Sequence, residues 1–157
     1  MRPFAILAAA ALLLTGCAAT PDEPEASLTP EASLTPDAQP TDDRCLTVDQ
    51  STADSMSLGL NVSGVELARW SAVKSNDDEK VWFVSAIATG GGLDGKAFTF
   101  ATNDDPTQPG IEGLTLAADG FTKEFTDWPY GPDTEFGVQL VDDGGQEPRD
   151  CAEAAID

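Results

Sequence analysis

Catalytic chemistry has few candidate residues in this sequence. The 157 residues include no histidine, so the commonest general base and the commonest transition-metal ligand are absent and a Ser-His-Asp triad is excluded. A lysine would have to activate a serine, but the neighbours Lys74 and Ser75 would leave a strand on opposite faces. Glu112 and Glu124 are the best-placed carboxylates for glycoside hydrolysis, although ordinary surface acids explain them better. We predict no catalytic residue, no cofactor and no enzyme activity.

Acidic loops offer oxygen ligands for a hard cation such as Ca²⁺. They lie at residues 76–79, 103–105 and 142–143, and each contains adjacent Asp or Asn residues. None has the spacing of an EF-hand, and Asn and Asp side chains also hydrogen-bond their own backbone in turns. We therefore predict turn-forming residues and no metal site, with calcium binding by these loops as the alternative.

Two aromatic residues are candidates for contact with a ligand. Trp128 and Tyr130 stand in the run Trp-Pro-Tyr-Gly-Pro, where prolines and glycine predict a loop. Loops carry binding residues disproportionately, and an exposed Trp–Tyr pair would stack on a sugar ring or anchor a partner. The alternative is that Trp128 plugs the end of a small core.

A short helix is expected near the start of the domain that holds these residues. Thr47 and Gln50 have the spacing of a capping box, with Thr47 as the N-cap. The helix would run to about Leu58, with Gly59 as its stop. One face would carry Val48, Thr52 and Met56.

Alternation with period two predicts the strands. Residues 67–75 and 81–89 form a hairpin around the loop 76–80, and the second strand begins with a run that is apolar on both faces. We expect this strand to be central, with Trp82 in the core and Trp70 packed on its partner strand. Further strands are expected at 96–102, 114–117 and, at an edge, 136–141. A helical turn at Phe121 and Phe125 and a terminal helix at 148–155 complete the pattern.

This order of elements predicts an α+β fold. The expected architecture is an antiparallel sheet of about four to five strands with a short N-terminal helix and short marginal helices. A wholly β sandwich is the alternative. We expect a single globular domain at residues 45–157, preceded by two segments of a different kind.

Residues 1–16 have the features of a signal peptide. A basic start is followed by the apolar run 4–14, which is too short to span a bilayer, and then by small residues. The tetrapeptide Leu14-Thr15-Gly16-Cys17 resembles the lipobox of bacterial lipoproteins. The resemblance implies that the Cys17 thiol receives a lipid with acyl chains such as palmitate, and that the chain is cut before it. The alternative is a cleaved, fully secreted protein with a stray cysteine.

Residues 17–44 are expected to form a lipid-anchored tether. They are rich in proline and acidic residues and repeat the unit Pro-Glu-Ala-Ser-Leu-Thr from Pro24 and again from Pro30. This composition buries too little apolar surface to fold, which predicts a disordered spacer between the membrane and the domain. The alternative is that the repeat is a docking or glycosylation motif.

With Cys17 assigned to the lipid, Cys45 and Cys151 remain, one near each end of the domain. Outside the cytoplasm two such thiols oxidise and stay oxidised, so we predict a disulfide between them. The chain-entropy estimate for so long a loop is roughly 4 to 5 kcal/mol.

The domain also resembles, in its order of features, small lipoproteins of unassigned activity from high-GC Gram-positive bacteria. The matching features are an early cysteine before a short helix, the segment Ala72-Val-Lys-Ser75 leading into Val81-Trp-Phe-Val84, the tripeptide Asp127-Trp-Pro129, and a late cysteine. The likeness implies no particular chemistry.

Charge and location together define the expected function. The formal net charge of −20 disfavours nucleic acid and favours cationic partners. We predict a lipid-anchored binding module on the extracytoplasmic face of the cell membrane, held there by its N-terminal lipid. Its partner would be an envelope protein, a wall polymer or a small ligand. The alternative function is an acidic inhibitor of a basic envelope-directed enzyme such as lysozyme.

Overall fold

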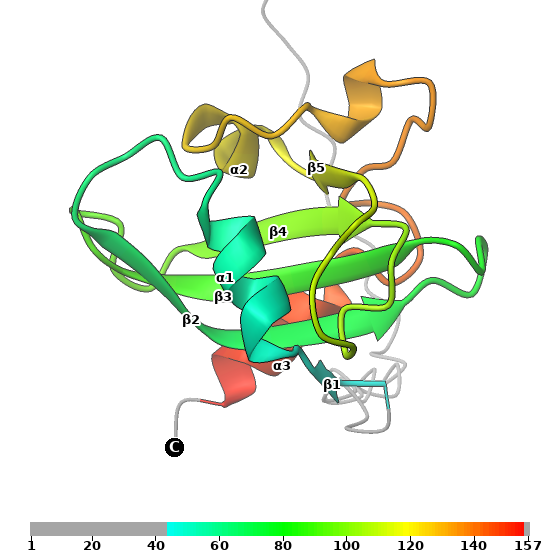
Figure 1. Cartoon of the computed structure of the whole chain (residues 1–157), viewed down its shortest axis with the longest axis horizontal. Helices are drawn as coiled ribbons and strands as arrows, with labels where there is room; N and C mark the ends of the chain where they lie inside the picture. The colour runs from blue at the N-terminus through cyan, green and yellow to red at the C-terminus, as the bar shows by residue number, and fades with distance from the viewer. Residues whose placement is uncertain (1–43, 156–157) are drawn as a thin grey trace, which may run out of the picture. The chain divides into compact units, whose positions relative to one another are not determined.

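A five-stranded antiparallel sheet organises the part of the chain that the computed structural model describes, residues 44–155 (Figure 1). The strands lie in sequence order, and this single antiparallel sheet with three short α-helices agrees with the predicted α+β class, so the β-sandwich alternative is not needed. The predicted signal peptide, Cys17 and tether residues 18–43 lie outside the described residues. The strands are β1 (Leu46–Thr47), β2 (Val65–Lys74), β3 (Trp82–Gly90), β4 (Ala97–Thr102) and β5 (Thr115–Ala117).

The predicted hairpin is the centre of this sheet. β2 pairs with β3 from Lys74 opposite Trp82 to Val65 opposite Gly90, and β3 pairs along its other edge with β4. Six consecutive residues of β3, from Phe83 to Ala88, are buried, as expected for a strand covered on both faces. Trp82 was predicted in the core, but it is half-buried at the strand's end, where the Lys74 ammonium lies 5.4 Å from its ring centroid.

One face of the sheet carries the main hydrophobic cluster. The helix α1 (Gln50–Ser57) packs here through Thr52 and Met56, which were predicted to share one face and are both fully buried. Five aromatic rings from β2, β4 and the segment around α2 (Gly120–Glu124) continue this layer. They are Trp70, Phe98, Phe100, Phe121 and Phe125, with neighbouring ring centroids 5.0 to 6.5 Å apart.

The N-cap of α1 differs from the prediction. Asp49 caps the helix, its carboxylate accepting from the backbone N–H of Ser51, whereas Thr47 belongs to β1 and pairs with Ser71. The reason is tertiary: pairing with β2 draws Thr47 into the sheet, and the backbone N–H of Asp49 donates to the carbonyl of Pro106. The predicted end of the helix near Leu58 is confirmed.

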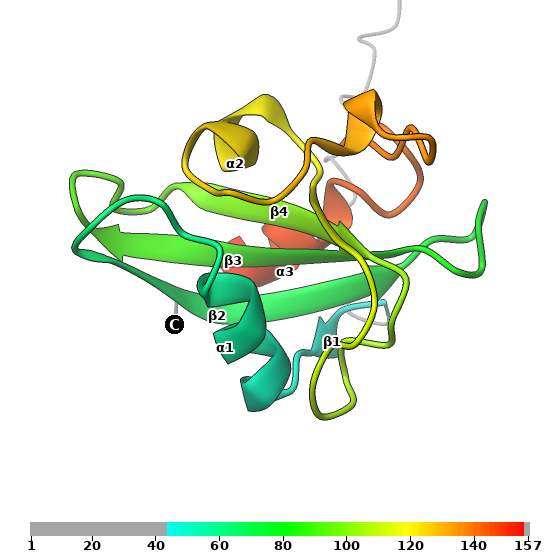
Figure 2. The ribbon, with the colours of Figure 1, turned by 45° about the horizontal axis from the view of Figure 1, so that its top comes forward.

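The opposite face is covered by the terminal helix α3 (Glu147–Ala154), which Figures 1 and 2 show behind the sheet with α1 in front. Ala152 packs there with Ile87 and Ala97. The prediction of this helix is confirmed, but its expected place at the margin is wrong, because α3 lies across β2 and β3. The buried hydroxyls of Ser85 on β3 and Thr99 on β4, which are paired in the sheet, share a hydrogen bond of 2.9 Å.

The predicted edge strand at 136–141 is absent from the described structure. After the short 3-10 helix η1 (Gly131–Asp133), this segment forms turns. Gly137 adopts a φ of 60°, and the Asp142 carboxylate accepts from the backbone N–H of Gln139, so the chain curls. One sheet-like bond remains, from Leu140 N to the carbonyl of Ala118. No helix in residues 44–155 is long and apolar enough to cross a membrane.

Candidate functional site

Trp128 belongs to the loop after α2, and its side chain contacts the C-terminal end of α1. Its indole Nε1 donates to the carbonyl oxygen of Met56 at 3.0 Å, and the half-buried ring packs against the main hydrophobic cluster. Gly59 lies so close to the indole that no side chain fits there. The structure therefore places Trp128 as the plug of the core, the alternative noted from the sequence, rather than as an exposed stacking platform.

Tyr130 is held by its backbone more than by its ring. The residue is half-buried and forms a parallel bridge with Ala117, the last residue of β5. The adjacent Pro129 accepts from the N–H of Ala117 at 2.8 Å, and the Lys123 ammonium donates to the carbonyl of Trp128. These contacts fix the loop. Of the two predicted binding residues, Trp128 packs against the main hydrophobic cluster and Tyr130 does not belong to it.

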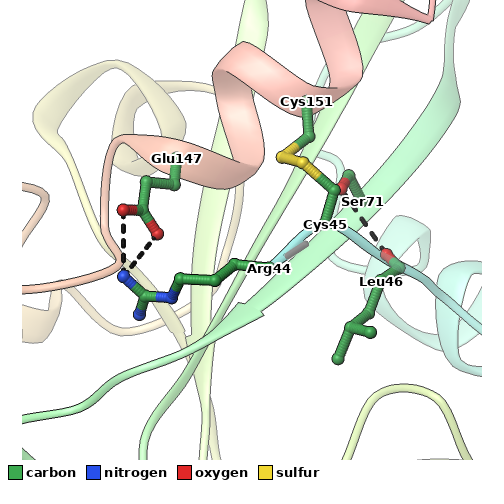
Figure 3. Close-up of a disulfide and its surroundings, with 6 residues drawn as sticks. All are labelled: Arg44, Cys45, Leu46, Ser71, Glu147 and Cys151. Atoms are coloured by element: carbon green, nitrogen blue, oxygen red, sulfur yellow. Dashed lines mark hydrogen bonds and ion pairs between the residues drawn. A yellow bond between two sulfur atoms is a disulfide. The ribbon is translucent and has the colours of Figure 1, made fainter. Parts of the chain in front are cut away.

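The cysteines at the two ends of the domain form the predicted disulfide, with a Cα–Cα distance of 5.9 Å (Figure 3). The bond ties the residue before β1 to the middle of α3. Beside it, Arg44 forms ion pairs with Asp143 at 3.2 Å and Glu147 at 2.8 Å and donates to the carbonyl of Lys74. Arg44, which the sequence assigned to the tether, is thus bound to the domain.

Asp143 joins three segments at this corner. Its carboxylate accepts from the backbone N–H of Asn76 at 2.7 Å as well as from the Arg44 guanidinium. The hydrogen bond from Asn76 is the main cause that lowers the pKa of Asp143 below its ordinary value, and the Arg44 charge adds to it. The corner is therefore a structural ion-pair network that also clamps the β2–β3 hairpin loop.

The other acidic loops use their carboxylates in the same structural way. Asp104 accepts from the backbone N–H groups of Glu112 and Gly113, and Asn103 accepts from that of Leu114. Asp78 accepts from the N–H of Lys80 in the hairpin loop. Within residues 44–155 no three His, Cys, Asp or Glu residues cluster to hold a metal ion. These side chains organise turns.

One spacing that sequence reasoning overlooked is S-x-x-K, at Ser71 to Lys74. In penicillin-binding enzymes this motif juxtaposes a nucleophile and a base. Here both residues lie on β2 three positions apart, which sends their side chains to opposite faces. Ser71 is buried and hydrogen-bonds the carbonyl of Leu46, while Lys74 is exposed over Trp82. The motif is therefore not arranged for nucleophilic catalysis. Glu112 and Glu124 are both exposed on separate elements.

The surface of residues 44–155 is hollowed beside the disulfide and at one end of β4. A groove of about 720 Å³ runs beside the disulfide, between β1, the bulge of β2 and the end of α3. A smaller, mainly apolar pocket of about 100 Å³ lies at the C-terminal end of β4, with Phe136 among its lining residues. Sequence reasoning missed this pocket because its walls come from three separate segments. A phenylalanine between acidic residues and a glycine, Glu135-Phe136-Gly137, was the signal available in the sequence.

Comparison of the chain with protein-family models, with curated proteins and with solved structures finds no match.

Proposed function

We propose that this chain is an extracytoplasmic binding module, anchored to the cell membrane by lipid on Cys17, that acts by holding a partner rather than by catalysis. The observation that carries the proposal is the pairing of Cys45 with Cys151. Disulfides of this kind persist in oxidising compartments outside the cytoplasm. The pairing also uses two of the three cysteines and leaves Cys17, within the lipobox-like tetrapeptide, for the lipid.

The residues available for chemistry support binding over catalysis. The chain has no histidine, both domain cysteines are oxidised, and the S-x-x-K serine and lysine are directed apart. The proline-rich segment before Arg44 would act as a spacer between the lipid and the domain. The strongly negative charge favours a basic partner, since opposite charges accelerate encounter.

Mass spectrometry of the chain purified from membranes of its native cell tests the anchor. We expect an N-terminal Cys17 carrying acyl mass, and a Cys17→Ser variant that leaves the membrane fraction. A native N-terminus without acyl mass would refute the anchor. Cross-linking in intact cells then tests the binding role: we expect a defined partner, which is lost when the domain is unfolded by reduction.

The second candidate is an inhibitor of a basic envelope-directed enzyme such as lysozyme. The formal net charge of −20 is the observation that favours it. We expect this activity to appear as dose-dependent loss of lysozyme turnover at low ionic strength that persists at about 0.15 M salt, where nonspecific attraction is screened. Inhibition that disappears at this salt concentration would mark simple charge attraction.

A further inference from the structure

The small apolar pocket lies where three segments distant in sequence converge. Its walls come from the β2–β3 hairpin loop, from the β4–β5 connection with the ends of those strands, and from the turn after η1. Figures 1 and 2 show the hairpin loop and this turn at the same end of the sheet. The lining residues are Asp78, Val81, Ala101, Thr102, Asn103, Leu114, Leu116, Phe136 and Val138.

The floor of the pocket belongs to the folded core, while its rim is exposed. Ala101, Leu116 and Val138 are buried and form part of one hydrophobic cluster with Phe83. Phe136, at the rim, is 60% exposed, although removing a phenylalanine side chain from water is energetically favourable. An apolar hollow continuous with the core and bordered by an exposed phenylalanine is the arrangement that receives an apolar side chain from another molecule.

The size of the pocket decides between kinds of ligand. Its volume is about 100 Å³. Drug-sized molecules and cofactors occupy clefts of roughly 300 to 1,000 Å³, whereas an apolar cavity of about 150 Å³ holds a single benzene ring. The pocket therefore fits one aliphatic side chain of about the size of leucine, which points to a protein partner.

Asp78 is the one charged residue among those that line the pocket, and the segments that form its walls carry further acidic residues. The residues that line the pocket, together with their immediate sequence neighbours, include five carboxylates and one ammonium group. The carboxylates belong to Asp77, Asp78, Glu79, Asp104 and Glu135, and the ammonium group belongs to Lys80. Basic residues on both sides of the inserted side chain would be attracted by Asp78 and by these acidic wall segments, and acidic ones would be repelled.

We propose that this pocket is the partner-binding site and that it receives a single leucine-sized side chain flanked by Lys or Arg residues of a basic protein. The inference rests on the proposed binding function and names its site and partner chemistry. The chain's own residues 18–43 contain Leu28 and Leu34, but their seven acidic and no basic residues make them a poor occupant of an acidic rim.

The test uses a fluorescently labelled peptide, Lys-Lys-Leu-Lys-Lys, and the full chain in a mild detergent, with fluorescence anisotropy as the readout. We expect binding that weakens with salt and that falls by about fivefold or more when the peptide leucine becomes alanine. Phe136→Ala should weaken binding by a similar factor. Leu58→Ala, which truncates a more exposed side chain at the C-cap of α1 and outside the pocket lining, is the matched control and should leave affinity unchanged.

A second pair of variants tests the charge. Asp78→Asn keeps the acceptor for the Lys80 N–H and should weaken binding by about twofold, whereas Glu66→Gln, at the opposite end of β2, should not. Equal affinity for Glu-Glu-Leu-Glu-Glu, or a peptide affinity insensitive to both Phe136→Ala and the loss of the peptide leucine, would overturn the proposal. So would peptide binding that tightens several-fold when residues 18–43 are deleted, because that result would identify the chain's own segment as the occupant.

The same variants separate this inference from the proposed function. If Phe136→Ala leaves the partner cross-linked in native cells as efficiently as the unmodified chain does, the binding module stands and the pocket is not its site. If no partner is cross-linked but the peptide still binds with the expected dependence on Phe136, the pocket chemistry stands and the proposed cellular role is contradicted.

Discussion

The indole nitrogen of Trp128 donates to the carbonyl oxygen of Met56 at 3.0 Å, across 72 residues of sequence. The bond adds a second donor to a carbonyl at the C-terminal end of α1, which also accepts from the backbone N–H of Gly59 at 3.3 Å. It also brings the loop after α2 against the main hydrophobic cluster. A residue that the sequence presented as a candidate ligand contact therefore has a structural task, which makes its replacement a test of folding.

Replacement of Trp128 should lower the free energy of unfolding. Trp128→Ala removes a half-buried ring and the bond to Met56, and we expect a loss of about 2 to 3 kcal/mol, whereas Trp128→Phe should lose about 1 kcal/mol. Tyr130→Phe serves as the control and should change stability little. Urea unfolding with unchanged m values measures this. A Trp128→Ala variant as stable as the unmodified chain would contradict the packing described above.

Gly59 provides an independent test of the same contact. A methyl group at this position would collide with the Trp128 indole, so Gly59→Ala should destabilise the fold by about 1 to 3 kcal/mol despite the usual gain from replacing glycine. Gly120→Ala is the matched control, because nothing lies within 4 Å of a side chain there, and it should be neutral or slightly stabilising. Thermal unfolding of the two variants side by side distinguishes the outcomes. Equal melting temperatures for the two variants would contradict the close contact between Gly59 and the Trp128 indole.

Loss of the disulfide should cost more than either change. Cys45 and Cys151 are 106 residues apart, and closing so long a loop restricts the unfolded chain by about 4 to 5 kcal/mol in the entropy model. We expect Cys45→Ser with Cys151→Ser to lower the denaturation midpoint strongly, and alkylation of the native domain to label neither cysteine. Labelling of both thiols before unfolding would disprove the bond.

The hairpin was predictable because its information is local. Alternating apolar residues around a five-residue polar loop indicate β2 and β3, and the burial of Met56 follows from helical spacing within α1. These features depend on neighbours in sequence, so periodicity reveals them. The terminal helix was predictable as an element for the same reason.

The features that were mispredicted depend on partners distant in sequence. Thr47 has the composition of an N-cap, but its pairing with Ser71 takes it into β1. Residues 136–141 alternate weakly, but Gly137 and the Asp142 carboxylate turn the chain. Periodicity does not report such contacts.

The candidate sites show the same division. Turn-forming Asp and Asn side chains were predictable from local chemistry, and the disulfide from the number and position of the cysteines. The role of Trp128 required the position of Gly59 and Met56, and the apolar pocket required three segments at once. The spacing of residues within one segment predicts neither the role of Trp128 nor the pocket.

Asp143 makes stability depend on pH in the acid range. Its pKa is lower in the folded chain than the ordinary value of 3.8, so its contribution is complete above that value and is lost as the pH falls through the lowered pKa. Asp143→Asn keeps an acceptor for Asn76 but removes the charge. We expect the unmodified chain to be the more stable one at pH 7 and the difference to shrink below about pH 4. Urea unfolding across this range measures it, and a constant difference would contradict the assignment.

Arg69 has a strained backbone conformation at the irregularity in β2. Arg69 and Trp70 lie opposite Ala86 alone, which makes a bulge, and Arg69 has a φ of 53° beside the groove next to the disulfide. A non-glycine residue in this region carries about 1 kcal/mol or more of strain, partly offset by the entropy that glycine loses on folding. Arg69→Gly should therefore raise the free energy of unfolding by about 0.5 kcal/mol, while Arg69→Val, whose branched side chain tolerates a positive φ least, should lower it by more than 1 kcal/mol. Paired denaturation curves for the two variants measure the difference. If valine were as stable as glycine at this position, the bulge would not impose a left-handed backbone on Arg69.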